Sequence, residues 1–124
     1  MDNLLKFLKI RRSVRVFQRK RIAKKQLEKI VDAARFAPTA RNLQPWEFAV
    51  ITDPVKLNQL AEIADHGKFI AQAGACIAVF TVDTKYFLED GSAATCNILL
   101  AAAALGIGSC WVAGDKKPYC LQVA

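Results

Sequence analysis

The sequence has few of the residue types that build metal sites or disulfides. It contains a single histidine, His66, and its four cysteines form no C-x-x-C pair. Cys76, Cys96 and Cys110 lie among Ala, Ile, Leu and Trp, which is typical of small buried side chains in a reducing compartment. We therefore expect no metal site, and we interpret these cysteines, with Cys120, as structural.

Long hydrophobic runs are also lacking. The longest small and apolar run, residues 93–108, is too short to cross a membrane and contains Asn97. At the N-terminus, Asp2, Asn3 and Lys6 interrupt the apolar residues, so the unbroken core of a signal peptide is missing. The 124 residues, 53% of them apolar, are enough for one globular domain. We expect a single domain over residues 1–124 that is cytoplasmic and has no membrane partner.

Acidic residues are scarce near the N-terminus, where the basic residues gather. Eleven of the 18 Lys and Arg residues fall within residues 6–29. The first 30 residues hold those eleven bases and two acids, a net charge of +9, whereas the seven bases and nine acids of the remainder give −2. The bases converge on the RRSVR sequence of residues 11–15. This concentration predicts an anionic ligand, which could be a phosphate, a nucleic acid or an acidic lipid.

The chemistry of this basic cluster leaves several interpretations open. Guanidinium groups bind phosphate oxygens in pairs, and the Ser13 hydroxyl can donate a further hydrogen bond. The cluster could equally be a solvated basic surface. A nucleic-acid-binding arm is a third interpretation, but aromatic residues that could stack on bases are scarce, because Phe7 and Phe17 fit the apolar pattern.

Hydrophobic periodicity predicts an α+β sandwich, because helices and strands mix without a strict βαβ order. Asp53 followed by Pro54 is typical of a helix start, and Gly106 of a left-handed helix end. The last helix is apolar nearly all round, so we expect it at the centre of the molecule or of an interface. The predicted helices cover residues 2–10, 24–36, 54–64 and 89–105; the predicted strands cover 46–52, 75–82 and 109–113, and residues 11–17 are extended.

Residues 37–48 form a second polar constellation, between a helix and a strand. Pro38 and Pro45 restrict the backbone, and Thr39, Asn42 and Gln44 offer short hydrogen-bonding groups. Rigid loops with such side chains are suited to recognising the edge of a planar heterocycle. The segment could equally be a helix cap and turn in which Asn42 satisfies backbone groups.

Taken together, the two segments carry a resemblance to a known family. RRSVRVF at residues 11–17, followed by APTA-x-N-x-QPW at residues 37–46, resembles the nitroreductase family of FMN-dependent oxidoreductases. The EDG-x-AA sequence from Glu89 and the LGIGSCW sequence ending at Trp111 are similar to the family's central helix and the strand after it. The resemblance implies a nitroreductase-like sandwich, with a central sheet flanked by helices, that assembles as an intertwined homodimer.

The resemblance also implies which residues bind the cofactor. The phosphate and ribityl end of FMN is assigned to the first motif, and the flavin ring to the second, typically from the partner subunit. Gln44 and Trp46 then hold the loop in shape, and Lys68 is interpreted as a surface lysine that could alternatively reach the flavin or the nicotinamide. The cofactor-binding residues expected on this basis are Arg11, Arg12, Ser13, Arg15, Pro38, Thr39, Ala40 and Asn42.

The chemistry implied by the family is ping-pong electron transfer from NADH or NADPH to a nitroaromatic, quinone or similar small-molecule acceptor. The flavin carries this chemistry, so no catalytic side chain of the protein is expected. The Gly106-Ile107-Gly108 sequence does not predict a Rossmann dinucleotide site, because it follows a helix and not a strand. His66 lies in a polar turn, where an exposed side chain is expected.

The end of the sequence departs from the family pattern. Family members continue past the third strand with a helix, a strand and a basic segment, whereas here residues 115–118 look like the loop into that helix. We therefore expect a C-terminally short member. The alternatives are a catalytically weak FMN-binding or interaction protein on the same fold and, more remotely, a basic nucleic-acid-binding domain; we expect no nucleic-acid partner.

Overall fold

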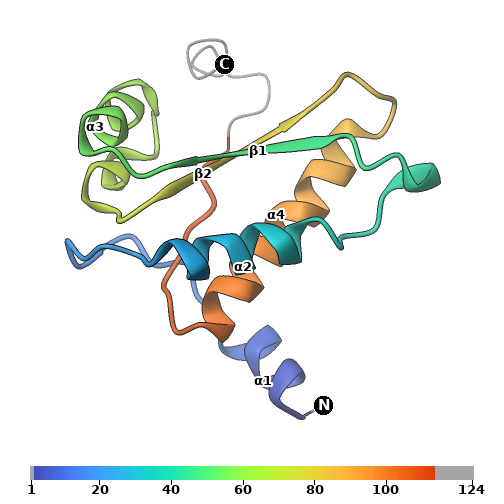
Figure 1. Cartoon of the computed structure of the whole chain (residues 1–124), viewed down its shortest axis with the longest axis horizontal. Helices are drawn as coiled ribbons and strands as arrows, with labels where there is room; N and C mark the ends of the chain where they lie inside the picture. The colour runs from blue at the N-terminus through green and yellow to red at the C-terminus, as the bar shows by residue number, and fades with distance from the viewer. Residues whose placement is uncertain (1, 114–124) are drawn as a thin grey trace.

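The computed structural model describes residues 2–113 of the chain. These residues form four helices and two strands (Figure 1), with a short 3-10 turn (η) before each strand. In chain order the elements are α1 (Asp2–Ile10), α2 (Lys24–Ala34), η1 (Ala40–Asn42), β1 (Trp46–Ile51), α3 (Pro54–Ile63), η2 (Lys68–Gln72), β2 (Cys76–Thr81) and α4 (Phe87–Ala104).

The sheet consists of β1 and β2, which pair antiparallel from Trp46 opposite Thr81 to Ile51 opposite Cys76. Side chains alternate between the two faces of a strand, so Phe48 and its partner Val79 share one face. That face packs on α2 and α4, which cross below the sheet in Figure 1. The sheet therefore rests on two helices, as expected for a strand pair that must bury one apolar face.

Small residues bring α2 and α4 together in the main core. Ala34 and Ala94 are completely buried, and Ile30 and Ile98 pack beside them. The amide of Asn97 on α4 donates a hydrogen bond of 3.0 Å to the backbone oxygen of Ala33 on α2. The prediction that the apolar helix lies at the centre of the molecule is confirmed, because α4 contacts α1, α2 and both strands.

A smaller core forms at the far end of the sheet. Leu57 and Ala61 of α3 pack against Ile70 of η2 and against the paired ends of the strands. The Asp53 side chain accepts a 3.3 Å hydrogen bond from the Val55 amide and caps α3. The predicted Asp-Pro helix start is therefore confirmed.

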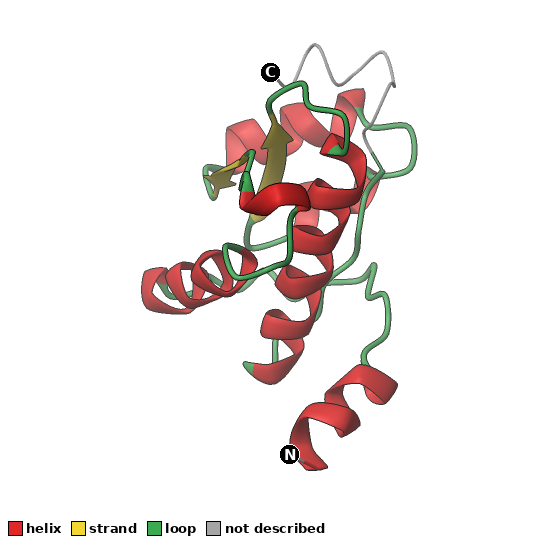
Figure 2. Ribbon diagram, turned by 90° about the vertical axis from the view of Figure 1, so that its right-hand side faces the viewer, coloured by secondary structure: helices red, strands yellow, loops and turns green. Residues whose placement is uncertain are grey.

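Helix α1 stands away from the rest of the molecule (Figure 2) and makes its main contacts with α4. Its leucines and its last isoleucine face solvent: Leu4 is 57% exposed, Leu8 is 50% exposed, and Leu5 and Ile10 are similar. An exposed apolar stripe of this kind marks α1 as a candidate contact surface.

The predicted third strand is wrong for the residues that the structure describes. Residues 109–113 are extended, but only Ser109 pairs, through an isolated parallel bridge to Ser13. Alternation of apolar residues predicts extended backbone, but a strand also needs a neighbouring chain that offers its hydrogen bonds. The described part of the central sheet therefore has two strands, while residues 115–118 and Cys120 lie outside the described residues.

Several element limits and one burial prediction also need correction. Helix α2 ends at Ala34 and not at residue 36, and α4 begins at Phe87, two residues before Glu89. Cys96 is exposed on α4, whereas Cys76 and Cys110 are half-buried. An apolar neighbourhood in sequence does not decide which side of a helix a residue occupies, and Cys96 lies on the side that no described element covers.

Within residues 2–113, no helix combines the length and apolar character needed to cross a membrane. The same residues contain no group of three or more His, Cys, Asp or Glu side chains placed to hold a metal ion.

Candidate functional site

The basic segment after α1 is extended, as predicted, and its place is set by the chain that follows α4. Ser13 bridges to Ser109, and the Val14 amide donates a 2.9 Å hydrogen bond to the Ser109 oxygen. A Cβ atom added to Gly108 would lie 3.1 Å from the Val14 side chain, so glycine allows the two segments to approach closely. The segment is therefore fixed against the end of α4.

The arginines of this segment have different surroundings. Arg12 folds back on α1, where its Nη1 donates to the backbone oxygens of Lys9 at 2.7 Å and of Arg11 at 3.0 Å. Within residues 2–113, the guanidinium groups of Arg11 and Arg15 make no hydrogen bond or ion pair. These two groups therefore keep their full capacity to bind an anion.

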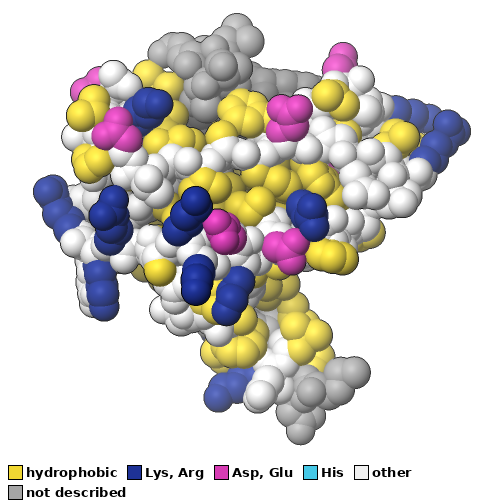
Figure 3. Space-filling model, in the orientation of Figure 1, with side chains coloured by type: hydrophobic (Ala, Val, Ile, Leu, Met, Phe, Trp, Pro, Cys, Tyr) yellow, Lys and Arg dark blue, Asp and Glu magenta, His cyan; other side chains and the backbone are white. Residues whose placement is uncertain are grey.

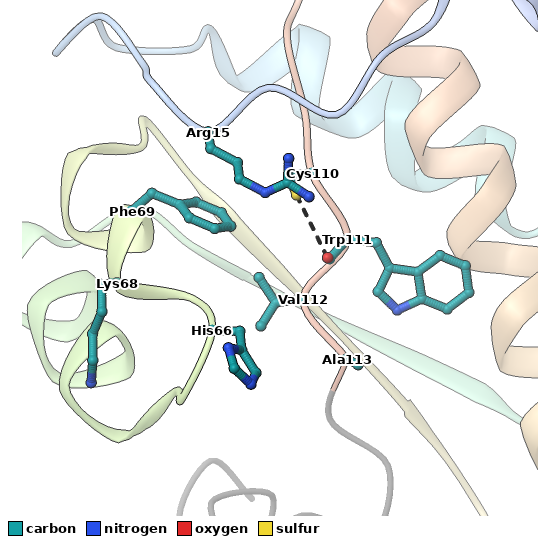
Figure 4. A pocket seen from close by; sticks show the side chains of 8 residues that line it. All are labelled: Arg15, His66, Lys68, Phe69, Cys110, Trp111, Val112 and Ala113. Atoms are coloured by element: carbon teal, nitrogen blue, oxygen red, sulfur yellow. Dashed lines mark hydrogen bonds between the residues drawn. The ribbon is translucent and has the colours of Figure 1, made fainter.

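Arg15 borders a cavity of about 590 Å³ (Figure 4). This volume lies within the range of small-molecule sites. The Arg15 side chain extends over the 110–113 segment with the Phe69 ring beside it. The cavity is lined by Arg15, His66, Lys68, Phe69, Cys110, Trp111, Val112 and Ala113.

The chemistry of the lining is basic and aromatic. Among residues 2–113, two basic side chains and one histidine line the cavity, and no acidic side chain does. The ring of Phe69 is held by Phe17, with ring centroids 6.0 Å apart. The Lys68 ammonium points away from the centre of the cavity and donates a 2.8 Å hydrogen bond to the Glu62 oxygen. Such a site suits a flat, anionic ligand.

The Pro38 loop, residues 38–45, has an unusual backbone. Arg41, Asn42 and Gln44 have φ angles of 55°, 54° and 50°, in the left-handed region that non-glycine residues rarely adopt. The Gln44 amide nitrogen donates to Thr39 Oγ1 at 3.2 Å, and Gln44 Nε2 donates to Asn42 Oδ1 at 2.9 Å. Strained backbone that is held by its own hydrogen bonds is typical of a functional loop.

The two predicted halves of the site do not meet within one chain. The Pro38 loop precedes β1, while the cavity takes Lys68 and Phe69 from η2, beside the opposite end of the strand pair (Figure 1). Six strand residues separate these ends by roughly 20 Å. Within residues 2–113 of one chain, the two predicted halves therefore lie at opposite ends of the strand pair.

A model of the family described as "Nitroreductase family" matches residues 8–75, more than half of the chain. An Archaeoglobus fulgidus protein described as an NADH dehydrogenase/NAD(P)H nitroreductase is 42% identical over 118 residues, 90% of this chain and 68% of that protein. The chain belongs to the nitroreductase family. It therefore spans about two thirds of the length of this family relative.

Solved structures of other family members share the fold. A nitroreductase-family structure from Bacteroides thetaiotaomicron superimposes with a TM-score of 0.93 at 32% identity, and covers 98% of this chain and 73% of that one. A Bacteroides fragilis nitroreductase solved with bound FMN has a TM-score of 0.80 at 28% identity, with coverages of 90% and 70%. The predicted family and fold are confirmed, as is, in general terms, an FMN-dependent oxidoreductase that uses NAD(P)H.

Sequence reasoning missed part of the cavity of this nitroreductase-family chain. His66 is exposed, as predicted, but it lines the cavity together with Phe69 and Trp111. These residues come from two segments about 40 positions apart that carry no shared motif, so no local pattern could have joined them. Lys68, interpreted as a surface lysine, lies at the edge of the cavity.

Proposed function

We propose that this protein binds FMN at the Arg15 cavity and transfers electrons from NADH or NADPH to a nitroaromatic, quinone or similar acceptor by a ping-pong mechanism. The observation that carries the proposal is the Arg15 guanidinium, which has no partner among residues 2–113 and lies at a basic, aromatic-lined cavity. A cytoplasmic location is part of the proposal, and subcellular fractionation tests it.

The basic segment fits the phosphate and ribityl end of FMN. The guanidinium groups of Arg11 and Arg15 have no partner among residues 2–113, and the exposed Ser13 hydroxyl can donate a further hydrogen bond. Arg12 has its Nη1 group on two backbone oxygens, so fewer of its donors remain for a phosphate. We therefore assign Arg11, Ser13 and Arg15 the larger part of the binding and Arg12 a smaller one.

FMN held at this site would supply the redox chemistry, namely hydride acceptance from a nicotinamide and electron donation to an acceptor. The protein positions the ring and provides the charge around it. Arg15 would place positive charge at one end of the cofactor, and among residues 2–113 no carboxylate lines the cavity to oppose it. Reductant and acceptor would then occupy the cavity in turn, so no nucleophile or general base of the protein is needed.

The flavin ring would meet the Pro38 loop of a second copy, through Pro38, Thr39, Ala40 and Asn42. The separation of the loop from the cavity in one chain supports this arrangement. The Oδ1 atom of Asn42 accepts from Gln44, and its Nδ2 group has no partner among residues 2–113 and can donate to a ring acceptor. The proposed active unit is therefore a homodimer.

Replacement of the arginines tests the binding assignment. We expect Arg15→Ala and Arg11→Ala each to weaken FMN binding about tenfold or more, because each removes a charge-assisted hydrogen bond. Fluorescence titration of the flavin-free protein measures this. Arg21→Ala is the matched control, since Arg21 is an exposed base outside the Arg15 cavity. Wild-type affinity in both cluster variants would contradict the phosphate assignment.

A catalytically weak FMN-binding protein is the second candidate. All six residues of β2 are only half-buried, and a further cavity of about 990 Å³ lies beside them. Figure 3 shows hydrophobic side chains in the opening between the sheet and α2. The purified protein distinguishes the candidates: a flavin spectrum with NAD(P)H-dependent reduction of a quinone supports the enzyme, and a flavin spectrum without turnover supports the binder.

A further inference from the structure

Asp90 is an acidic residue in the core of this protein that is not among the residues proposed to bind FMN. Its side chain lies in the first turn of α4, and the residue is only 4% exposed. Among residues 2–113 it is the charged side chain that is buried. Burying a carboxylate is unfavourable unless its oxygens find hydrogen-bond donors, so its position calls for a physical reason.

The two oxygens of Asp90 have unequal surroundings. Oδ1 accepts a 3.1 Å hydrogen bond from the backbone amide of Ala40, which lies 50 residues earlier in the chain. Oδ2 is buried and has no partner within the described residues. An apolar side chain at this position would leave no oxygen unsatisfied, but it could not accept the hydrogen bond from Ala40.

The Ala40 amide begins the turn that shapes the Pro38 loop. Ala40 opens η1, and the next two residues, Arg41 and Asn42, adopt left-handed backbone. Strained backbone of this kind persists only where its surroundings hold it. The Asp90 bond joins this turn to the longest helix of the structure, while the other side-chain bonds of the loop stay within the loop.

We propose that Asp90 is a positioning residue for the flavin ring. Its carboxyl fixes the start of η1 and thereby sets where the Asn42 amide points. This inference rests on the proposed function, because it takes the Pro38 loop as the part of the protein that meets the ring. Asp90 itself touches no cofactor in this scheme and acts through the Ala40 amide.

Two substitutions at Asp90 separate the hydrogen bond from the charge. Asp90→Ala removes the acceptor, whereas Asp90→Asn keeps an oxygen that can accept from Ala40. We expect Asp90→Ala to weaken FMN binding about tenfold and Asp90→Asn to stay within about threefold of wild type. The matched controls are Glu89→Ala and Glu89→Gln, which change the exposed acid beside Asp90 and should bind FMN as wild type does.

The midpoint potential of bound FMN provides a readout that a purely structural role would not move. Measured at saturating FMN, it should shift to a more negative value in Asp90→Ala, because a displaced Asn42 amide no longer stabilises the reduced ring. Asp90→Asn should keep the wild-type potential. A wild-type potential and affinity in Asp90→Ala, or equal losses in both Asp90 variants, would overturn the proposal.

Ala40→Pro keeps the test decisive if Asp90→Ala fails to fold. It removes the donating N–H, and the extended backbone of Thr39 (φ −135°, ψ 152°) is the conformation that a following proline requires. We expect the same weakening and the same potential shift as in Asp90→Ala, and wild-type behaviour would overturn the inference. If the wild-type protein itself binds no FMN, the proposed function fails, a result distinct from any difference among these variants.

Discussion

At the scale of single residues, left-handed backbone identifies two different kinds of position. Arg41, Asn42 and Gln44 adopt it without being glycine, in the loop proposed to meet the flavin ring. Gly106 adopts it with a φ of 76° just after α4, and a Cβ atom added there would touch nothing within 4 Å. The three non-glycine residues are strained in this conformation, as residues at functional sites often are, whereas glycine at position 106 adopts it without strain and ends the helix.

Gly106 provides a residue-scale prediction. Gly106→Ala should lower the free energy of unfolding by about 1 kcal/mol, because an L-residue is disfavoured in left-handed backbone even without a steric clash. Urea unfolding measures the change. The unfolding free energy of Gly106→Asn should fall less, since asparagine tolerates this conformation. Gly74→Ala is the contrasting variant: its Cβ would lie 2.6 Å from the Lys20 oxygen, so its loss should be larger. Equal stability of Gly106→Ala and wild type would contradict the cap assignment.

At the scale of elements, the ends of the helices depend on single side chains to different degrees. Asp53 caps α3 with its carboxylate, and proline follows at the first helical position. Helices α2 and α4 have no side-chain cap, and both are held instead by the core that they form together. We therefore expect α3 to depend on its cap more than the other two.

The cap of α3 gives the element-scale prediction. Asp53→Ala should lower the free energy of unfolding by about 1 kcal/mol, because the Val55 amide loses its acceptor. Asp53→Asn should remain close to wild type, since its side-chain oxygen can accept the same bond. Thermal unfolding followed by circular dichroism compares the three proteins. A loss in Asp53→Asn as large as in Asp53→Ala would show that the charge matters and not the cap.

At the scale of the whole molecule, two observations favour a second copy. The apolar stripe of α1 is exposed in one chain, and the Pro38 loop lies at the opposite end of the strand pair from the Arg15 cavity. A symmetric pair of chains could cover the apolar stripe of α1 and also bring the Pro38 loop of one chain to the Arg15 cavity of the other. The proposed homodimer would therefore be a condition for flavin binding as well as an assembly state.

Substitution in α1 tests this link. Leu4→Gln combined with Leu8→Gln should weaken dimerisation roughly a hundredfold, because both side chains are at least half exposed in one chain and would be buried between two. The unfolding free energy of the single chain should change little. Sedimentation velocity measures the assembly, and FMN content should fall with the dimer fraction. Lys6→Gln combined with Lys9→Gln is the control on the same helix; a dimer that survives the leucine changes would contradict this interface.

Most helices and both paired strands could be predicted from local pattern, because burial of an apolar face imposes its period on the sequence. The limits of α1 were predicted without error, and those of α3 and β1 to within one residue. The prediction of a third strand at residues 109–113 was wrong, because the apolar pattern does not show whether a neighbouring strand is there to pair with it; only Ser109 pairs, with Ser13. The predicted burial of Cys96 was wrong for a similar reason, since its exposure depends on which elements surround α4.

The sequence by itself determined the family, the basic motif and the polar loop, because each of these depends on residues that are adjacent in the chain. Only the tertiary structure decided that, among residues 2–113, Arg12 is hydrogen-bonded whereas Arg11 and Arg15 have no partner, and that His66 and Trp111 share a cavity. It also decided that Asp90 holds the start of the Pro38 loop. The physical reason is that hydrogen bonds and burial depend on distances between segments far apart in the chain, which no local pattern contains.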